Sequence, residues 1–243
     1  MTASPSADLT GAVLRPVRGH HAFEACVEQL ATAIRLGVYP RDTFLPPERE
    51  LAERMSVSRA TLREAIAALR AAGMVQTTRG RGGGTVVLHK PKAPRASAAA
   101  ALKGRHSQLL DALAFRRVVE PGAAELAAER ELDGPTQTLL RTCLDAVSHA
   151  ESPVTHRQCD SRLHLAIATA CGSPLTIAAV TRVQRDLHDM LQAIPVLAVN
   201  IDHSNTQHEA IVTAILTGDP RKARRVMSEH CEDTAALLRG LLG

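Results

Sequence analysis

Two groups of polar side chains have types and spacings that could support chemistry. Asp160 and His164 are four residues apart, so on a helix their side chains would share one face. A carboxylate and an imidazole placed in this way can bind one cation. Arg59 and Arg63 are also four residues apart, and guanidinium groups can pair with guanine or with phosphate. The sequence therefore suggests two hypotheses, a metal site and a nucleic-acid contact.

The metal hypothesis needs further ligands, and two histidines in later helical segments are candidates. His208 and His230 could reach the same cavity if the segments form a bundle. Three histidines and one carboxylate suit Zn²⁺, Ni²⁺ or Mn²⁺ and leave coordination positions open for a ligand. The chain contains 11 histidines, however, and His203 competes with His208 for this role. Spacing alone leaves the choice of ligands open.

The arginine pair lies in a segment that is typical of a helix beginning at Ser58. A serine at this position can cap the helix by accepting hydrogen bonds from its first N–H groups. Residues 47–54 predict a short preceding helix, so a helix, a tight turn and a second helix follow one another. This arrangement can place the second helix in a DNA major groove. Its inward face is expected to be formed by Leu62, Ile66 and Leu69.

Other polar residues surround this predicted recognition helix. The hydroxyls of Ser58 and Thr61 could contact phosphate or bases, and Arg49 in the preceding helix could reach the same groove edge. Residues 75–78 and 85–88 predict two short strands joined by the glycine-rich tip Arg79–Gly84, a hairpin that could approach the DNA backbone. The alternative is that the arginines form a solvated face of an ordinary helix.

Charge is distributed unevenly along the chain. The net charge is +4, and residues 1–90 hold twelve Lys and Arg against eight Asp and Glu, whereas the rest of the chain is balanced. This asymmetry favours a phosphate-facing N-terminal module joined to a neutral one. The five cysteines are widely spaced, which indicates buried, reduced thiols in a cytoplasmic protein. The sequence predicts neither a signal peptide nor a membrane span.

Hydrophobic periodicity predicts a mainly α fold. We expect a flexible N-terminal arm over residues 1–20, a winged helix-turn-helix over 21–89, a linker over 90–105 and an all-helical bundle of about six helices over 106–240. The helices of the bundle are expected at 106–131, 135–150, 155–171, 174–194, 200–217 and 220–240.

The N-terminal motifs are similar to those of a known family. The segment that carries the similarity is LPPERELAERMSVSRATLREAIAALRAAGMVQTTRGRGGGTVV. It resembles the winged helix-turn-helix of the GntR family of bacterial transcription regulators, over roughly residues 21–88. The resemblance to FadR-type members implies base contacts by Arg59 and Arg63 and backbone contacts by neighbouring residues. The operator-contacting positions that it implies are Arg49, Ser58, Arg59, Thr61, Arg63 and Gly80 in the wing.

The C-terminal segments FRRVVEPGAAELAAER, DSRLHLAIATACGSP and HEAIVTAILTGDPRKARRVMSEH resemble the FCD ligand-binding domain of FadR-type regulators. The resemblance implies a homodimer on two operator half-sites and a small organic-acid effector, with Arg116 contacting its carboxylate. An alternative role for Arg116 is a structural bridge to Glu120, four residues later. The metal ligands that the resemblance implies are Asp160, His164, His208 and His230.

These motifs predict a metabolite-responsive transcription regulator, a repressor, that is not an enzyme. Two alternatives stay open from the sequence. The first is a hydrolase-like enzyme in which the metal activates water, although no further residue near these motifs is placed as a general base. The second is a constitutive DNA binder whose metal site is purely structural.

Overall fold

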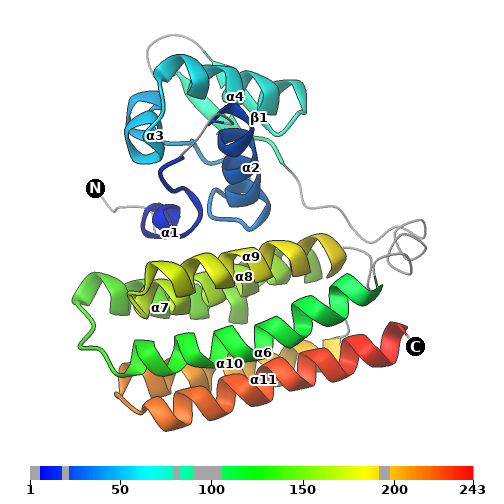
Figure 1. Cartoon of the computed structure of the whole chain (residues 1–243). Helices are drawn as coiled ribbons and strands as arrows, with labels where there is room; N and C mark the ends of the chain where they lie inside the picture. Colours follow the sequence, from blue (N-terminus) through cyan, green and yellow to red (C-terminus); the bar gives the residue numbers. More distant parts are fainter. Residues whose placement is uncertain (1–5, 18–21, 79–82, 90–105, 192–197, 243) are drawn as a thin grey trace. The chain divides into compact units, whose positions relative to one another are not determined.

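The structure is a computed structural model that describes residues 6–17, 22–78, 83–89, 106–191 and 198–242 (Figure 1). The chain divides into two compact units, Met1–Pro91 and Lys92–Gly243, and each is described here by itself. The linker expected over residues 90–105 lies outside the described residues, as do the first four residues of the predicted wing tip, Gly80 among them.

The N-terminal unit has the expected helix-turn-helix followed by a two-stranded hairpin. Helix α2 packs against α4, and α3 packs against α4 as well. The strands are antiparallel, with Val75 opposite Val87, and both of these side chains are buried. The elements are α1 (Ser6–Val13), α2 (Ala22–Arg35), α3 (Glu48–Met55), α4 (Arg59–Ala71), β1 (Val75–Thr78) and β2 (Gly84–Val87).

Residues 6–17 differ from the flexible arm that the sequence predicted. Helix α1 packs against α2, and Leu9, Val13 and Leu14 are almost fully buried. The hydroxyl of Thr10 is hydrogen-bonded to the hydroxyl of Tyr39 at 3.0 Å, which satisfies a buried phenol. The prediction of a loose arm was wrong here because the small polar composition hides an apolar pair at Leu9 and Val13, spaced by one helical turn.

The start of α4 agrees with the capping pattern in the sequence. Ser58 has extended backbone angles, and its Oγ accepts a hydrogen bond from the N–H of Thr61 at 3.0 Å. The turn before it is tight because Ser56 adopts the left-handed conformation, with φ at 54°. The predicted inner face of α4 is confirmed, since Leu62, Ile66 and Leu69 are buried.

The C-terminal unit is a helical bundle, as predicted. Helix α6 packs against α11, α9 and α8, while α7 packs against α8 and α10 against α11. Among the described residues, no helix combines the length and apolar composition that a membrane span would need. The helices described in this unit are α6 (His106–Ala128), α7 (Gly134–Ser148), α8 (Pro153–Ala170), α9 (Pro174–Leu191), α10 (Ala198–Leu216) and α11 (Pro220–Leu242).

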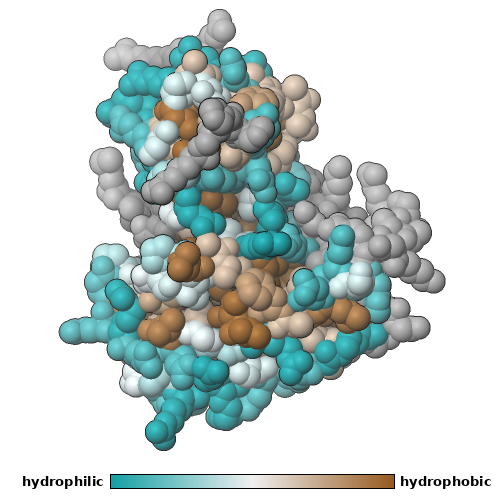
Figure 2. Space-filling model, in the orientation of Figure 1, coloured by the Kyte–Doolittle hydropathy of each residue, from teal (hydrophilic) through white to brown (hydrophobic). Residues whose placement is uncertain are grey.

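One side of this unit exposes large apolar side chains. Figure 2 shows apolar surface gathered over α6, and Val118 on this helix is 72% exposed. Extended apolar surface of this kind marks interaction sites more often than scattered single residues do. The exposed apolar side chains of α6 are Leu110, Phe115, Val118 and Leu126.

Candidate metal centre and DNA-contacting surface

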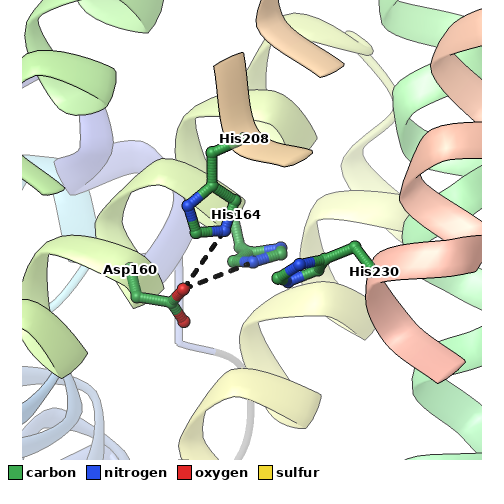
Figure 3. A group of neighbouring side chains, drawn as sticks. All are labelled: Asp160, His164, His208 and His230. Carbon is green, nitrogen blue, oxygen red and sulfur yellow. Dashed lines mark ion pairs between the residues drawn. The ribbon is translucent and has the colours of Figure 1, made fainter. Parts of the chain in front are cut away.

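The bundle brings the four predicted metal ligands together from three helices. Asp160 and His164 lie on α8, His208 on α10 and His230 on α11, and Figure 3 shows their side chains converging. One potential ligand atom from each residue lies within 4.8 Å of the others. The three histidines are at most 2% exposed. Of the two competing histidines, His208 is in this cluster, whereas the His203 side chain is 63% exposed and pairs with Asp233.

The Nε2 atoms of the histidines face the centre of the cluster. Asp160 Oδ1 lies 3.3 Å from His208 Nε2 and 3.9 Å from His164 Nε2 (Figure 3). His230 Nδ1 is hydrogen-bonded to Gln207 Oε1 at 3.1 Å, and because an amide oxygen only accepts, the ring proton is on Nδ1. His164 Nδ1 lies 3.0 Å from Glu120 Oε2, so a proton is favoured there too. Contacts of this kind orient histidine ligands in metal sites.

The donor set fits a metal ion, and one buried atom supports this independently. Among the described residues, both ring nitrogens of His208 are buried and neither makes a hydrogen bond of good geometry, although Nε2 lies 3.3 Å from Asp160 Oδ1. Leaving a buried polar group unsatisfied typically costs about 1–3 kcal/mol. A cation at the centre would satisfy His208 Nε2, and three imidazoles with one carboxylate form a donor set that such ions prefer.

Arg116 forms the helix bridge to Glu120 that the sequence suggested, and it also contacts two of the clustered histidines. Its Nε donates to Glu120 Oε2 at 2.8 Å, so the predicted i,i+4 bridge is present, and both side chains are buried. Its Nη2 also donates to Nε2 of His164 at 3.2 Å and to Nε2 of His230 at 3.1 Å. A guanidinium group can only donate, so both imidazoles accept these hydrogen bonds at Nε2. Arg116 is therefore part of the cluster as well as a helix bridge.

Glu120 is a member of the cluster that the sequence identified only as a partner of Arg116. Burial alone would raise the pKa of Glu120, but the Arg116 guanidinium and the neighbouring His164 outweigh burial and hold this pKa well below its usual range. Gln184 on α9 donates to its other oxygen at 2.6 Å. Gln184 was not singled out from the sequence, because its approach depends on how α9 packs against α6.

The charges of the cluster do not cancel. Burial would raise the pKa of Asp160, but its close contacts with His208 and His164 outweigh burial and hold this pKa well below the usual value. Burial lowers the pKa of His208, and it lowers that of His230 well below 6.5. Two carboxylates and one guanidinium therefore leave one excess negative charge, since burial keeps His208 and His230 neutral and His164 Nε2 accepts a hydrogen bond from Arg116. This excess attracts a cation.

The lowered histidine pKa values predict how stability depends on pH. His208 and His230 stay neutral in the folded protein, whereas the unfolded chain takes up protons near the ordinary value of 6.5. The unfolded state thus binds more protons below this pH. The free energy of unfolding of the metal-free chain should fall between about pH 7 and pH 5, by up to about 1.4 kcal/mol per unit for each histidine.

Urea unfolding at several pH values, in the presence of a chelator, measures this dependence. The His208→Gln variant should show a shallower slope, because one of the two titrating groups is gone. A flat profile for the unmodified chain over this pH range would contradict the assignment of neutral histidines.

The predicted DNA-contacting arginines lie on the surface of α3 and α4. Arg59 is exposed, and the side chains of Arg49 and Arg63 are 69% and 71% exposed. Arg49 pairs with Glu53 at 3.4 Å, and Arg63 pairs with Glu48 across the two helices, also at 3.4 Å. Exposed pairs of this kind contribute at most about 1 kcal/mol, so both guanidinium groups can leave them for a stronger partner.

The two hydroxyl residues are partly engaged within the helix start. Ser58 Oγ accepts from the Thr61 N–H and also lies 2.9 Å from Thr61 Oγ1, with both side chains at the surface. Ser58 therefore has a structural role as a helix cap, whatever it contacts in DNA. Gly80, the wing position implied by the resemblance, lies outside the described residues.

Comparisons with known proteins match each of the two units to a known family. Residues 23–87 match the family described as bacterial regulatory proteins, gntR family, and residues 111–233 match the FCD domain. The chain is 32% identical over 211 residues to a putative HTH-type transcriptional regulator, RmpR, of Mycobacterium gastri, covering 85% of this chain and 76% of that protein. It is 30% identical over 205 residues to a putative L-lactate dehydrogenase operon regulatory protein of Escherichia coli, covering 76% of this chain and 74% of that protein.

A solved structure supports the fold. The Escherichia coli protein McbR/YncC aligns with a TM-score of 0.53 at 16% identity, covering 93% of this chain and all of that one. The matching families and the named relatives are transcription regulators and not enzymes. The protein is thus a DNA-binding transcription regulator with a ligand-binding C-terminal domain. It belongs to the GntR family of bacterial regulators, in the group that carries an FCD domain.

Proposed function

We propose that this regulator is a repressor that binds operator DNA as a homodimer and is released by a small organic acid. The acid binds beside a divalent metal ion, which we take to be Zn²⁺, with Ni²⁺ or Mn²⁺ as alternatives. The observation that carries the proposal is the convergence of four potential ligand atoms around a buried His208 Nε2 that makes no hydrogen bond of good geometry with the described residues. The proposed ligands are Asp160, His164, His208 and His230.

The ion would supply a positive centre with open coordination positions. Its ligand atoms would be the three Nε2 atoms and a carboxylate oxygen of Asp160, and Arg116 Nη2 would then give up its hydrogen bonds to His164 and His230. Glu120 and Gln207 would hold these two rings in orientation. Since the cluster without metal carries one excess negative charge, a divalent cation changes this to one excess positive charge. A monocarboxylate would restore neutrality in a buried site, which supports an organic acid as the effector.

Arg116 is the proposed contact for the effector carboxylate. Its Nη2 already lies among the Nε2 atoms, at 3.1 Å from that of His230, and a guanidinium group binds carboxylates through two parallel hydrogen bonds. The name of the Escherichia coli relative refers to an L-lactate dehydrogenase operon. Lactate and related hydroxy acids are therefore the first compounds to test.

In the N-terminal unit, we assign base contacts to Arg59 and Arg63 on α4, which would enter the major groove. Arg49, Ser58 and Thr61 would contact the DNA backbone, and Gly80 in the wing would allow close approach to phosphate. DNA reading is thus assigned to residues 21–89, and effector binding and dimerisation to residues 106–240. We also assign the protein to the cytoplasm, where operator DNA would be bound.

The homodimer is supported by the exposed apolar side chains along α6, which a second copy could cover (Figure 2). Two recognition helices in such a dimer would contact two half-sites of one operator. Effector binding would release DNA only if the acid binds more tightly to the conformation with low DNA affinity.

The experiment uses the full chain and the promoter DNA next to its own gene. Metal content is measured first, and DNA affinity is then titrated with a panel of small carboxylates in the presence and absence of metal. The proposal predicts that one class of acid weakens DNA binding only when metal is bound. An affinity that no acid changes, with or without metal, would instead support a constitutive DNA binder with a structural metal site.

A further inference from the structure

A chain of polar contacts connects the buried His230 to the surface of α10 and α11. His230 Nδ1 is hydrogen-bonded to Gln207 Oε1 at 3.1 Å, and Gln207 Nε2 donates to Asp233 Oδ2 at 2.7 Å. The same carboxylate oxygen lies 3.0 Å from His203 Nε2. Gln207 is only 9% exposed, whereas the side chains of Asp233 and His203 are 51% and 63% exposed. This series of polar contacts thus runs from a proposed metal ligand to solvent.

The contacts have a defined direction. A hydrogen bond from His203 and another from Gln207 lower the pKa of Asp233, and slight burial offsets them only in part. The carboxylate is therefore ionised and only accepts. Gln207 must therefore turn its NH₂ group toward Asp233, which leaves its Oε1 facing His230. A reversed Gln207 amide would place its Oε1 against the carboxylate oxygen of Asp233. The proton of His230 is consequently on Nδ1, and the lone pair is on Nε2.

We propose that Gln207 and Asp233 are positioning residues for the metal site. Asp233 sets the orientation of the Gln207 amide, and Gln207 sets the tautomer and the ring orientation of His230. The inference rests on the proposed metal site, but neither residue is one of the four ligands. Their effect on the ion passes through the His230 ring.

The use of an amide at this position follows from the charges of the cluster. His164 has a buried carboxylate, Glu120, beside its Nδ1, and the cluster already carries one excess negative charge. A second buried carboxylate beside His230 would add another charge that needs compensation. With Gln207 in between, the negative charge lies on the half-exposed Asp233, where water solvates it. The His230 ring is still oriented by a hydrogen-bond acceptor, Gln207 Oε1.

The first test measures the affinity of the full chain for Zn²⁺ by competition with a chromophoric chelator. Gln207→Met keeps a similar side-chain volume and removes the acceptor, so affinity should fall by about 10- to 100-fold, as for other partners of metal-bound histidine. The matched control is Gln137→Met. It removes the hydrogen bond from Gln137 Nε2 to the carbonyl of Leu132 at 2.9 Å, on α7, and should leave Zn²⁺ affinity unchanged. A wild-type affinity in Gln207→Met would overturn the proposal.

The second test reverses the direction of the hydrogen bonds from Asp233 through Gln207 to His230. In Asp233→Lys the new ammonium group only donates, so Gln207 should turn its oxygen outward and its NH₂ toward His230. His230 must then accept at Nδ1, and the proton moves to Nε2, where it blocks the metal. ¹⁵N NMR of the imidazole nitrogens in the metal-free protein reads the tautomer directly. Asp233→Asn keeps an acceptor and should retain the wild-type tautomer.

Glu229→Lys controls for the change in charge. Glu229 lies on the same helix, pairs with Arg225 at 2.8 Å and is exposed, so this variant adds the same charge without contacting Gln207. It should keep the Nδ1–H tautomer, and persistence of that tautomer in Asp233→Lys as well would overturn the proposal. Absence of Zn²⁺ binding in the wild-type chain would reject the metal site instead, while the tautomer measurement in metal-free protein would still test the positioning role.

Discussion

Replacing Arg63 with alanine should weaken binding to specific operator DNA by about 10- to 100-fold, the loss expected for one bidentate base contact. The Arg63 side chain is 71% exposed on α4, and its pairing with Glu48 at 3.4 Å is a weak surface contact. Little free energy opposes its transfer to guanine. The fold should be unaffected, because the buried face of α4 is formed by other residues.

Fluorescence anisotropy with operator and with unrelated DNA, at one fixed salt concentration, measures this effect. The loss should be confined to operator DNA, since phosphate contacts dominate non-specific binding. Arg70→Ala is the matched control, because Arg70 is exposed in the last turn of the same helix, away from the end that we propose to enter the groove. Arg49→Ala should instead weaken binding to both DNAs. It should also lower the slope of log affinity against log salt concentration by about one. An unchanged operator footprint and affinity in Arg63→Ala would reject its assignment to base readout.

Replacing His208 with alanine should abolish the thermal stabilisation of the protein by Zn²⁺. A ligand present at a hundred times its dissociation constant stabilises a fold by about 2.7 kcal/mol, and this contribution disappears when the site is lost. His208 is fully buried, and its Nε2 lies 3.3 Å from Asp160 Oδ1, so no other described side chain can replace it without repacking. Release from operator DNA by the effector acid should be lost with the metal.

Differential scanning fluorimetry with and without Zn²⁺ provides the measurement for His208→Ala. His149→Ala is a matched control, because the His149 side chain is 77% exposed at the end of α7 and pairs with Asp145, outside the cluster. A chelator should make the wild-type chain behave like His208→Ala. If His208→Ala keeps the full shift in unfolding temperature with Zn²⁺, His208 is not a ligand.

Most of the helices could be predicted because their signals are local. Ser58 caps α4, apolar residues repeat at Leu62, Ile66 and Leu69, and each predicted helix of the bundle agrees with the structure to within three residues at either end. Helix α1 was missed because its signal is short, with Leu9 and Val13 as its main apolar pair. Its stability comes from packing against α2 and not from its own propensity.

The candidate site was predictable in part. His203 and His208 are five residues apart and so point about 140° apart on a helix, which means that only one of them could face the cluster. Which one it is depends on how α10 is rotated against α11, and this is a property of tertiary packing. The same holds for Gln184 and Gln207, whose contacts arise only when the helices meet. Gln207 precedes His208 directly, but adjacency in sequence does not indicate that it contacts His230 instead.

The origin of the four ligands on three separate helices has a consequence for kinetics. Asp160 and His230 are 70 positions apart in the chain, so the cluster forms only after α8, α10 and α11 have packed together. Contacts that form late in folding contribute little to the transition state, and they slow unfolding without accelerating folding. A bound ion would therefore lengthen the lifetime of the folded bundle, and the metal-free regulator would open and be degraded sooner than the loaded one.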